Sequence, residues 1–236
     1  MQNNWSIIKA VFPHTIPVLT GYLFLGMAFG ILLQSSGYGV GWAFLMSLVV
    51  FAGSIQFVTV GLIAAGFQPL QALLLTLLVN ARHIFYGLSM LEKFAPLGKY
   101  RPYLVFALTD ETYSLLCTIT PPPELDRPRF YFFIALLNHS YWVIGSVLGS
   151  WAGMLLPFDY TGIEFVMTAL FVVIFLEQWQ TQKDHRPALI GVGGSLLCLI
   201  IFGAQWFIIP SMVLLVIALT AIRRSYEARA LKEGEA

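Results

Sequence analysis

Long apolar runs follow one another along most of this chain, with only short polar interruptions. No Asp, Glu, Lys or Arg occurs between Lys9 and Arg82, and the stretches 130–157 and 187–222 are also free of these residues. A membrane-spanning helix needs about 20 apolar residues, so these stretches alone can hold about five spans. The pattern predicts a polytopic membrane protein.

The apolar runs also suggest where the helices lie. The positions of Gly, Pro and charged residues predict up to eight helices, at 15–36, 42–66, 69–92, 103–120, 130–156, 163–180, 187–204 and 206–222. The links at 66–69 and 203–207 are so short that the helices on either side are expected to be antiparallel. We expect an all-α membrane helix bundle of about seven or eight segments, forming a single transporter domain over residues 1–236.

Two of these helices are expected to be discontinuous. The helix at 42–66 is interrupted by Ala52-Gly53-Ser54, and the helix at 103–120 carries Thr109-Asp110-Glu111-Thr112 in its middle. Unwound backbone at membrane depth is tolerated only where it lines a cavity or packs on protein. Both breaks are therefore candidates for a functional site.

The composition excludes several classes of protein. Hydrophobic residues make up 58% of the chain and charged residues 11%, against about 25% charged residues in soluble proteins. The net charge of +1 gives no reason to expect nucleic acid as a partner. Cys117 and Cys198 have no paired spacing, so neither a disulfide framework nor a redox cofactor is expected. No small-residue cleavage site follows the first apolar run, so the first helix is expected to remain.

The distribution of basic residues raises a problem of topology. The Arg-rich tail after residue 222 predicts a cytoplasmic C-terminus by the positive-inside rule. Eight full spans would then place the loop with Lys93, Lys99 and Arg101 on the outer side, against the same rule. A segment that enters the membrane without crossing it would remove the conflict.

A faint internal echo raises the question of a two-fold repeat, which is common in secondary transporters. The pattern Gly26, Gly30, Tyr38, Phe51 and Gln56-Phe57 resembles Gly145, Gly149, Tyr160, Phe175 and Gln178-Trp179. A chance match fits equally well; a real repeat would be parallel if four spans separate its halves and inverted if one segment is discontinuous. The two Gly-x-x-x-Gly motifs are expected to pack helices closely. Most of the six tryptophans, Trp5, Trp42, Trp142, Trp151, Trp179 and Trp206, are expected near helix ends at the headgroup boundary, without chemistry.

Ionisable residues inside a span each cost at least a few kcal/mol and so require a reason. In the third helix Thr76, Asn80, His83 and Gly87 share one face, while Arg82 lies about 100° round from His83. An imidazole titrates near neutral pH, so His83 is a candidate proton carrier. The alternative for Arg82 is that it extends toward the loop at 92–93, about 15 Å away.

Asp110 and Glu111 are adjacent carboxylates in the middle of a predicted span. A buried carboxylate must either pair with a cation such as Arg82 or take up a proton, and proton-coupled transport uses the second option. A purely structural ion pair with Arg82 is the alternative.

At the other break, the residues from Gly53 to Phe57 would expose backbone groups that bind carboxylates or cations. A simple kink, with Ser54 bonding back along its own helix, is the alternative. Asn138, His139, Glu177 and Gln178 are weaker candidates.

These motifs resemble the AzlC family, the large subunit of branched-chain amino acid exporters. The resemblance is carried by Ala52-Gly53-Ser54-Ile55-Gln56-Phe57, Leu78-Val79-Asn80-Ala81-Arg82-His83-x-x-Tyr86-Gly87 and Leu108-Thr109-Asp110-Glu111. It implies a bacterial inner-membrane antiporter that exports valine, leucine, isoleucine and, in some members, methionine. It also implies a small AzlD-type membrane subunit as partner.

An aliphatic zwitterion needs donors for its carboxylate, acceptors for its ammonium and an apolar pocket for its side chain. The residues expected to bind substrate are Gly53, Ser54, Gln56, Phe57, Asn80, Arg82 and Tyr86, with Phe85 as a further apolar contact. Those expected to carry the coupling proton are His83, Asp110 and Glu111.

Two other classes of function compete with a transporter. A membrane metalloenzyme would use His83, His139, Asp110, Glu111 and Glu177 as ligands, but no H-E-x-x-H or similar spacing supports it. A passive channel or scaffold subunit is the other alternative. Since the chain has no phosphate-binding loop, energy for a transporter would come from an ion gradient. We expect no enzymatic activity and no cofactor.

Overall fold

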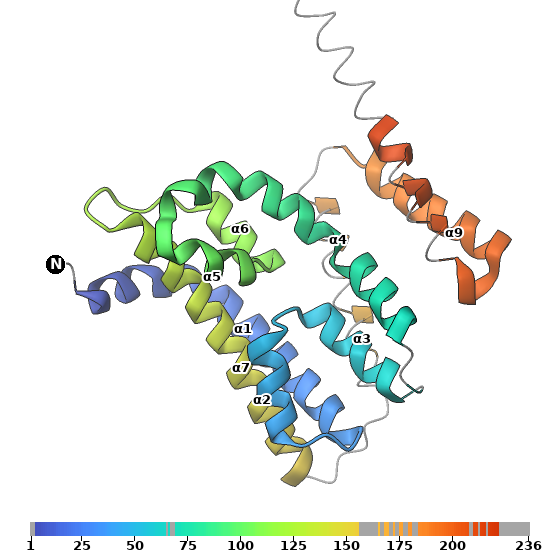
Figure 1. Cartoon of the computed structure of the whole chain (residues 1–236), viewed down its shortest axis with the longest axis horizontal. Coiled ribbons are helices and arrows are strands. Elements are labelled where there is room, and N and C mark those ends of the chain that lie inside the picture. The colour runs from blue at the N-terminus through green and yellow to red at the C-terminus, as the bar shows by residue number, and fades with distance from the viewer. Residues whose placement is uncertain are drawn as a thin grey trace, which may run out of the picture. The chain divides into compact units, whose positions relative to one another are not determined.

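The computed structural model describes residues 3–64, 66, 69–155 and, with gaps, 165–221, and its regular elements there are helices (Figure 1). This confirms the all-α prediction. The chain divides into two compact units, Met1–Thr168 and Ala169–Ala236. The predicted helix at 163–180 lies largely outside the described residues, as does Glu177. Of the predicted helix at 206–222, the described residues between 210 and 221 are helical.

Unit 1 contains three long helices and several short ones. They are α1 (Asn4–Ser35), α2 (Val40–Val49), α3 (Gly53–Ala64), α4 (Pro69–Phe94), the 3₁₀ helix η1 (Ala95–Tyr100), α5 (Arg101–Phe106), α6 (Asp110–Thr118) and α7 (Arg127–Leu155). The first helix begins at Asn4 and not at residue 15, so that prediction was wrong. The cause is an N-cap in the polar N-terminal segment, where Asn3 Oδ1 accepts a hydrogen bond from Trp5 N at 3.2 Å.

α1 and α7 form the central contact of unit 1, and the two Gly-x-x-x-Gly motifs face each other in it. A Cβ on Gly26 would lie 3.0 Å from Ser146 N, and one on Gly145 would lie 2.8 Å from Tyr22 O. Only glycine allows the two backbones to come this close, which confirms the packing role. Further along, Gly153 faces Gln34. The residue numbers of the contacting positions thus increase in the same direction along both helices, so α1 and α7 run parallel.

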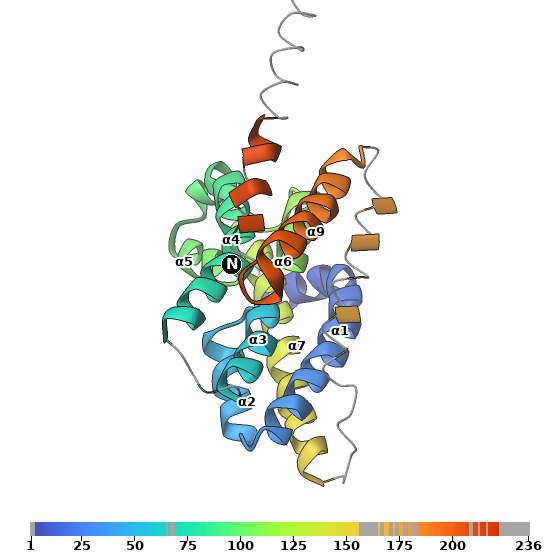
Figure 2. The ribbon, with the colours of Figure 1, turned by 90° about the vertical axis from the view of Figure 1, so that its right-hand side faces the viewer.

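α4 runs in the opposite direction to α1 and α7 (Figures 1 and 2). At the C-terminal end of α4, Lys93 donates a hydrogen bond to Leu116 O and lies 5.0 Å from the Tyr131 ring near the start of α7. The start of α7 also meets the first half of α1, where the rings of His14 and Phe130 are 6.5 Å apart. The end of α4 therefore lies at the same end of unit 1 as the starts of α1 and α7.

The short helices consequently form two helical hairpins that enter unit 1 from opposite ends. The 40–64 hairpin, α2 and α3, begins where α1 ends and finishes where α4 begins. The 101–118 hairpin, α5 and α6, lies between the end of α4 and the start of α7. Neither hairpin crosses the unit. The loop at 92–102 therefore shares an end of unit 1 with the N-terminus.

Both predicted helix breaks are confirmed. The first is at Phe51, whose φ is +33°, and the second precedes α6, where Thr109 Oγ1 accepts from Thr112 N at 3.3 Å. Both pack on the middle of α1, because the Tyr22 ring contacts Phe51 and its hydroxyl lies 2.7 Å from Thr109 Oγ1. At the first break a Cβ on Gly53 would lie 2.9 Å from the Trp142 ring of α7. The tips of the two hairpins thus meet in the middle of unit 1.

The order of elements repeats within unit 1. A long helix followed by a hairpin occurs twice, as α1–α2–α3 and as α4–α5–α6, in opposite directions. Such inverted repeats are typical of secondary transporters. The glycines of the predicted echo belong to one contact between α1 and α7, and its members Tyr160 and Gln178 lie outside the described residues.

Unit 2 contains α9 (Arg186–Trp206), close to the predicted helix at 187–204. Within this unit the Trp179 and His185 rings stack at 4.1 Å. Among the described residues, three helices are long and apolar enough to cross a membrane, at Asn4–Ser35, Arg127–Leu155 and Arg186–Gly203. The 26 residues of α4 give a length of about 39 Å, also sufficient to cross, although its polar residues make it less apolar.

Candidate functional site

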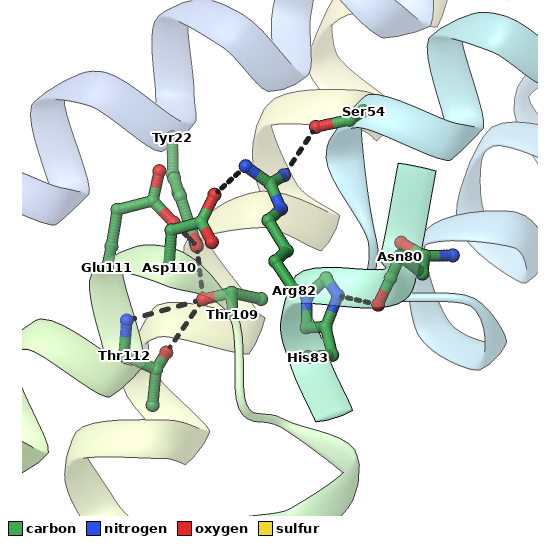
Figure 3. Close-up of polar contacts among 9 residues, drawn as sticks. All are labelled: Tyr22, Ser54, Asn80, Arg82, His83, Thr109, Asp110, Glu111 and Thr112. Atoms are coloured by element: carbon green, nitrogen blue, oxygen red, sulfur yellow. Dashed lines mark hydrogen bonds and ion pairs between the residues drawn. The ribbon is translucent and has the colours of Figure 1, made fainter. Parts of the chain in front are cut away.

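Arg82 of α4 joins the tips of the two hairpins (Figure 3). Its Nη1 lies 2.7 Å from Asp110 Oδ2 at the start of α6, and its Nη2 donates to Ser54 Oγ at 2.9 Å at the start of α3. The Arg82 and Asp110 side chains are 31% and 25% exposed, so the pair is largely removed from the surface. The alternative in which Arg82 extends toward the loop at 92–93 is wrong, because its guanidinium turns inward to a carboxylate.

The hairpin geometry brings two helix N-termini to this place. α3 begins at Gly53 and α6 at Asp110, so both carboxylates lie in the first turn of α6. Helix N-termini carry partial positive charge, which favours Asp110 and Glu111 there. The Asp110, Glu111, Arg82, Ser54 and Tyr22 side chains are called the central cluster below.

The two adjacent carboxylates have different partners. Asp110 is paired with Arg82, whereas Glu111 Oε2 accepts a hydrogen bond of 2.6 Å from the Tyr22 hydroxyl (Figure 3). Tyr22 was not among the predicted residues. A tyrosine in the middle of a long apolar helix was the signal that could have identified it, because its hydroxyl needs a partner there.

Hydrogen bonds continue from the central cluster to α7. Thr109 Oγ1 is 3.0 Å from Thr112 Oγ1, which accepts from Asn138 Nδ2 at 3.1 Å. Asn138 is fully buried. A continuous polar path therefore runs from Glu111 through Tyr22 and two threonines to the centre of α7.

His139 and Trp142 of α7 connect the two hairpins to this long helix. The His139 ring nitrogens lie 3.0 Å from the Tyr103 hydroxyl of α5 and 3.1 Å from Ser47 O of α2. Because a carbonyl only accepts, Nε2 carries the proton in this arrangement. His139 therefore connects both hairpins.

Trp142 Nε1 donates to Gln56 Oε1 at 2.7 Å. Trp142 is 3% exposed in the middle of α7, so the position near a helix end expected for most of the tryptophans does not hold for this one. Gln56 is fully buried, and the Phe57 ring lies 5.7 Å from Phe29 of α1. Gln56 therefore contacts α7 and Phe57 contacts α1. Of the residues at the start of α3, Ser54 is the one that bonds to Arg82 of the ion pair.

The other face of α4 borders a separate cavity of about 190 Å³. Asn80, His83 and Gly87 line it together, as their helical spacing predicts, and Arg82 lies on a different face. His83 Nδ1 is 3.2 Å from Asn80 O. Tyr86 stacks on Tyr113 at 4.3 Å, and its hydroxyl faces Asp110.

Several buried polar atoms around the tips lack a hydrogen-bond partner. Within the described part of the chain these include Asp110 Oδ1, Arg82 Nε and Asn80 Oδ1. An unsatisfied buried polar group costs about 1–3 kcal/mol, so such a concentration requires an explanation. Asp110 Oδ1 and Arg82 Nε offer an acceptor and a donor to a small polar ligand at the ion pair, and Asn80 Oδ1 offers an acceptor on the cavity face of α4.

The described residues contain no group of three or more His, Cys, Asp or Glu side chains positioned to hold a metal ion. Of the proposed ligands of a metalloenzyme, His83 and His139 lie in different surroundings, on the α4 cavity and between the two hairpins.

Comparisons with known proteins identify the family. A family model described as "AzlC protein" matches residues 17–156, which span both hairpins and all of the central cluster. The chain belongs to the AzlC family. The resemblance seen in the sequence motifs is thereby confirmed.

Several known proteins are similar to the chain over most of their length. "Branched-chain amino acid transport protein AzlC" of Bacillus subtilis (strain 168) is 46% identical over 223 residues, covering 94% of this chain and 88% of that protein. An "Uncharacterized membrane protein" of Haemophilus influenzae is 45% identical, with coverage of 87% and 84%. "Inner membrane protein YgaZ" of Escherichia coli (strain K12) is 27% identical, with coverage of 85% and 82%. No solved structure matches the chain. The chain is thus a membrane protein of a transport family and not an enzyme.

Proposed function

We propose that this AzlC-family chain is a secondary transporter that exports branched-chain amino acids in exchange for protons, together with a small AzlD-type subunit. The name of the Bacillus subtilis relative supports the substrate class. The inverted pair of hairpins supports the transporter mechanism, because discontinuous helices that meet at the centre of inverted repeats form substrate sites in secondary transporters.

The observation that carries the proposal is the Arg82–Asp110 pair at the two hairpin tips. An amino acid is a zwitterion and needs a donor set and an acceptor set close together. The Arg82 guanidinium and the first turn of α3 at Gly53 and Ser54 can meet its carboxylate. The unpartnered Asp110 Oδ1 can accept from its ammonium. Substrate would then satisfy groups that have no partner in its absence.

The proton-coupling role is best suited to Glu111. Asp110 is engaged by Arg82, whereas Glu111 is held by the neutral Tyr22 hydroxyl. A protonated Glu111 can still accept this hydrogen bond through its carbonyl oxygen, so gain and loss of a proton leave the local packing intact. His83, on the cavity side of α4, is the second candidate.

The charge distribution supports an orientation in the bacterial inner membrane. The basic residues of unit 1 outside the helix centres lie at the end that holds the N-terminus, namely Lys9, Lys93, Lys99, Arg101, Arg127 and Arg129. By the positive-inside rule this end faces the cytoplasm. The prediction of a cytoplasmic C-terminus rests on the tail after residue 222, which lies outside the described residues.

Counterflow in proteoliposomes tests the proposed function. Vesicles loaded with unlabelled valine should accumulate labelled valine or leucine with saturation, because a carrier exchanges substrates and an open channel does not. Vesicles with this chain alone and with an added AzlD-type subunit should differ, the second being active. Non-saturating flux would favour a channel, and equal exchange in both preparations would remove the partner from the proposal.

A further inference from the structure

The cavity beside α4 is built by both hairpin breaks. Its walls come from the first break, the segment before the second break and one face of α4, with lining residues Val50, Phe51, Ala52, Asn80, His83, Gly87, Val105, Phe106 and Leu108. Phe51 and Leu108 are 3% and 4% exposed and form its inner part, while Val105 and Phe106 form a more exposed rim. Most of the lining is therefore aliphatic or aromatic.

The polar wall of the cavity adjoins the central cluster. Asn80 lines the cavity, and its Oδ1 is buried without a hydrogen-bond partner. Arg82, two residues further along α4, holds Asp110 and Ser54 on a different face of the helix (Figure 3). Ala52 and Leu108 each lie two residues before a cluster residue, Ser54 and Asp110. The cavity is therefore lined by the segments next to those that carry the central cluster.

We infer that this cavity receives the aliphatic side chain of the transported amino acid and that Gly87 sets the largest side chain it accepts. The inference rests on the proposed function and adds the specificity pocket to it. A cavity of about 190 Å³ is smaller than the roughly 300–1,000 Å³ of pockets for drug-sized ligands. This volume is sufficient for a branched aliphatic group, because an apolar cavity of about 150 Å³ holds a molecule of the size of benzene.

Gly87 is the wall residue at which size can be changed with least disturbance. A Cβ added there would meet no atom within 4 Å, so alanine fits without a collision. The added methyl group takes up cavity volume instead. One methyl or methylene group in an apolar pocket changes specificity about 10–200-fold.

The experiment compares wild type with Gly87→Ala and Gly87→Val in proteoliposomes containing the full chain, with the small subunit where exchange requires it. Counterflow of labelled alanine, valine and leucine is measured. Gly87→Ala should reduce leucine exchange about tenfold while alanine exchange stays within about twofold. Gly87→Val should lower valine exchange as well. Gly61→Ala is the matched control, because a Cβ added to that exposed glycine of α3 would also meet no atom within 4 Å.

The outcomes separate this inference from the proposed function. An equal loss for all three amino acids, or an unchanged leucine-to-alanine ratio, would overturn the specificity role of Gly87. Absence of exchange in wild type would count against the proposed function alone. Binding of leucine to the cavity would then be tested by thermal unfolding in detergent. Leucine should raise the Tm of wild type and not that of Gly87→Ala. If leucine shifts both proteins equally, or neither, the pocket is wrong.

Discussion

Asp110 and Glu111 are neighbours in the sequence, yet their substitution should have different consequences. Asp110→Asn leaves the Arg82 guanidinium without its ion partner. Loss of one partner of a fully buried pair costs about 3–5 kcal/mol, and the partial exposure of this pair reduces that figure. Glu111→Gln keeps an acceptor for the Tyr22 hydroxyl. We therefore expect low yield and a lowered Tm for Asp110→Asn, and normal yield for Glu111→Gln.

Transport by Glu111→Gln is the informative measurement. The amide mimics a protonated acid, so valine counterflow should persist while flux driven by a pH gradient falls at least tenfold. Asn138→Ala is a useful comparison, because it disturbs the polar path at α7 without removing a carboxylate. Wild-type gradient-driven flux in Glu111→Gln would end the coupling role of Glu111.

At the scale of elements, the contact between α1 and α7 is expected to be sensitive to a single methyl group. A Cβ on Gly149 would lie 2.5 Å from Met27 Cα, so alanine there must push the two backbones apart. Overpacking of this kind costs about 1–3 kcal/mol. Gly149→Ala should therefore lower the Tm in detergent. Gly21→Ala in α1, where a Cβ has open space, should leave it unchanged; equal effects would mean that the close contact contributes nothing specific.

The elements also show how far local sequence reaches. The helix breaks were predictable because each is marked by a residue at the break itself. Gly53 has no side chain, and Asp110 places a charge in the middle of a predicted span. The basic residues suggested one segment that does not cross, but the return of both hairpins was not predictable, since the direction of a segment depends on contacts such as that of Lys93 with the end of α6. Trp142 was misplaced for the same reason: composition suggests a headgroup anchor, while its partner Gln56 lies on another helix.

At the scale of the whole molecule, the two ends of unit 1 should be distinguishable by chemical labelling. Pro123 lies in the loop between α6 and α7, at the end with the basic residues, and Gly39 lies between α1 and α2 at the other end. Both positions are exposed, and a Cβ at Gly39 has open space. In a background of Cys117→Ser and Cys198→Ser, Gly39→Cys should react with a membrane-impermeant thiol reagent in intact cells. Pro123→Cys should react only in inverted vesicles.

The opposite labelling pattern would reverse the proposed orientation. Labelling of both positions from one side would contradict the hairpin topology itself, because it would place the two ends of unit 1 on the same face of the membrane.

The glycine contact between α1 and α7 has a consequence for hydrogen exchange. These two helices meet backbone to backbone, whereas the hairpin tips are joined to them and to each other through side chains such as Arg82 and Tyr22. Local opening needs least free energy where few backbone groups are packed or hydrogen-bonded. Amides of the hairpin tips, at 50–56 and 106–112, should therefore exchange faster than amides of the α1–α7 contact, at 22–31 and 142–150. Added valine should slow exchange at the tips and leave the α1–α7 pair unchanged, as measured by mass spectrometry. Equal exchange in all four segments would mean that unit 1 opens as one body.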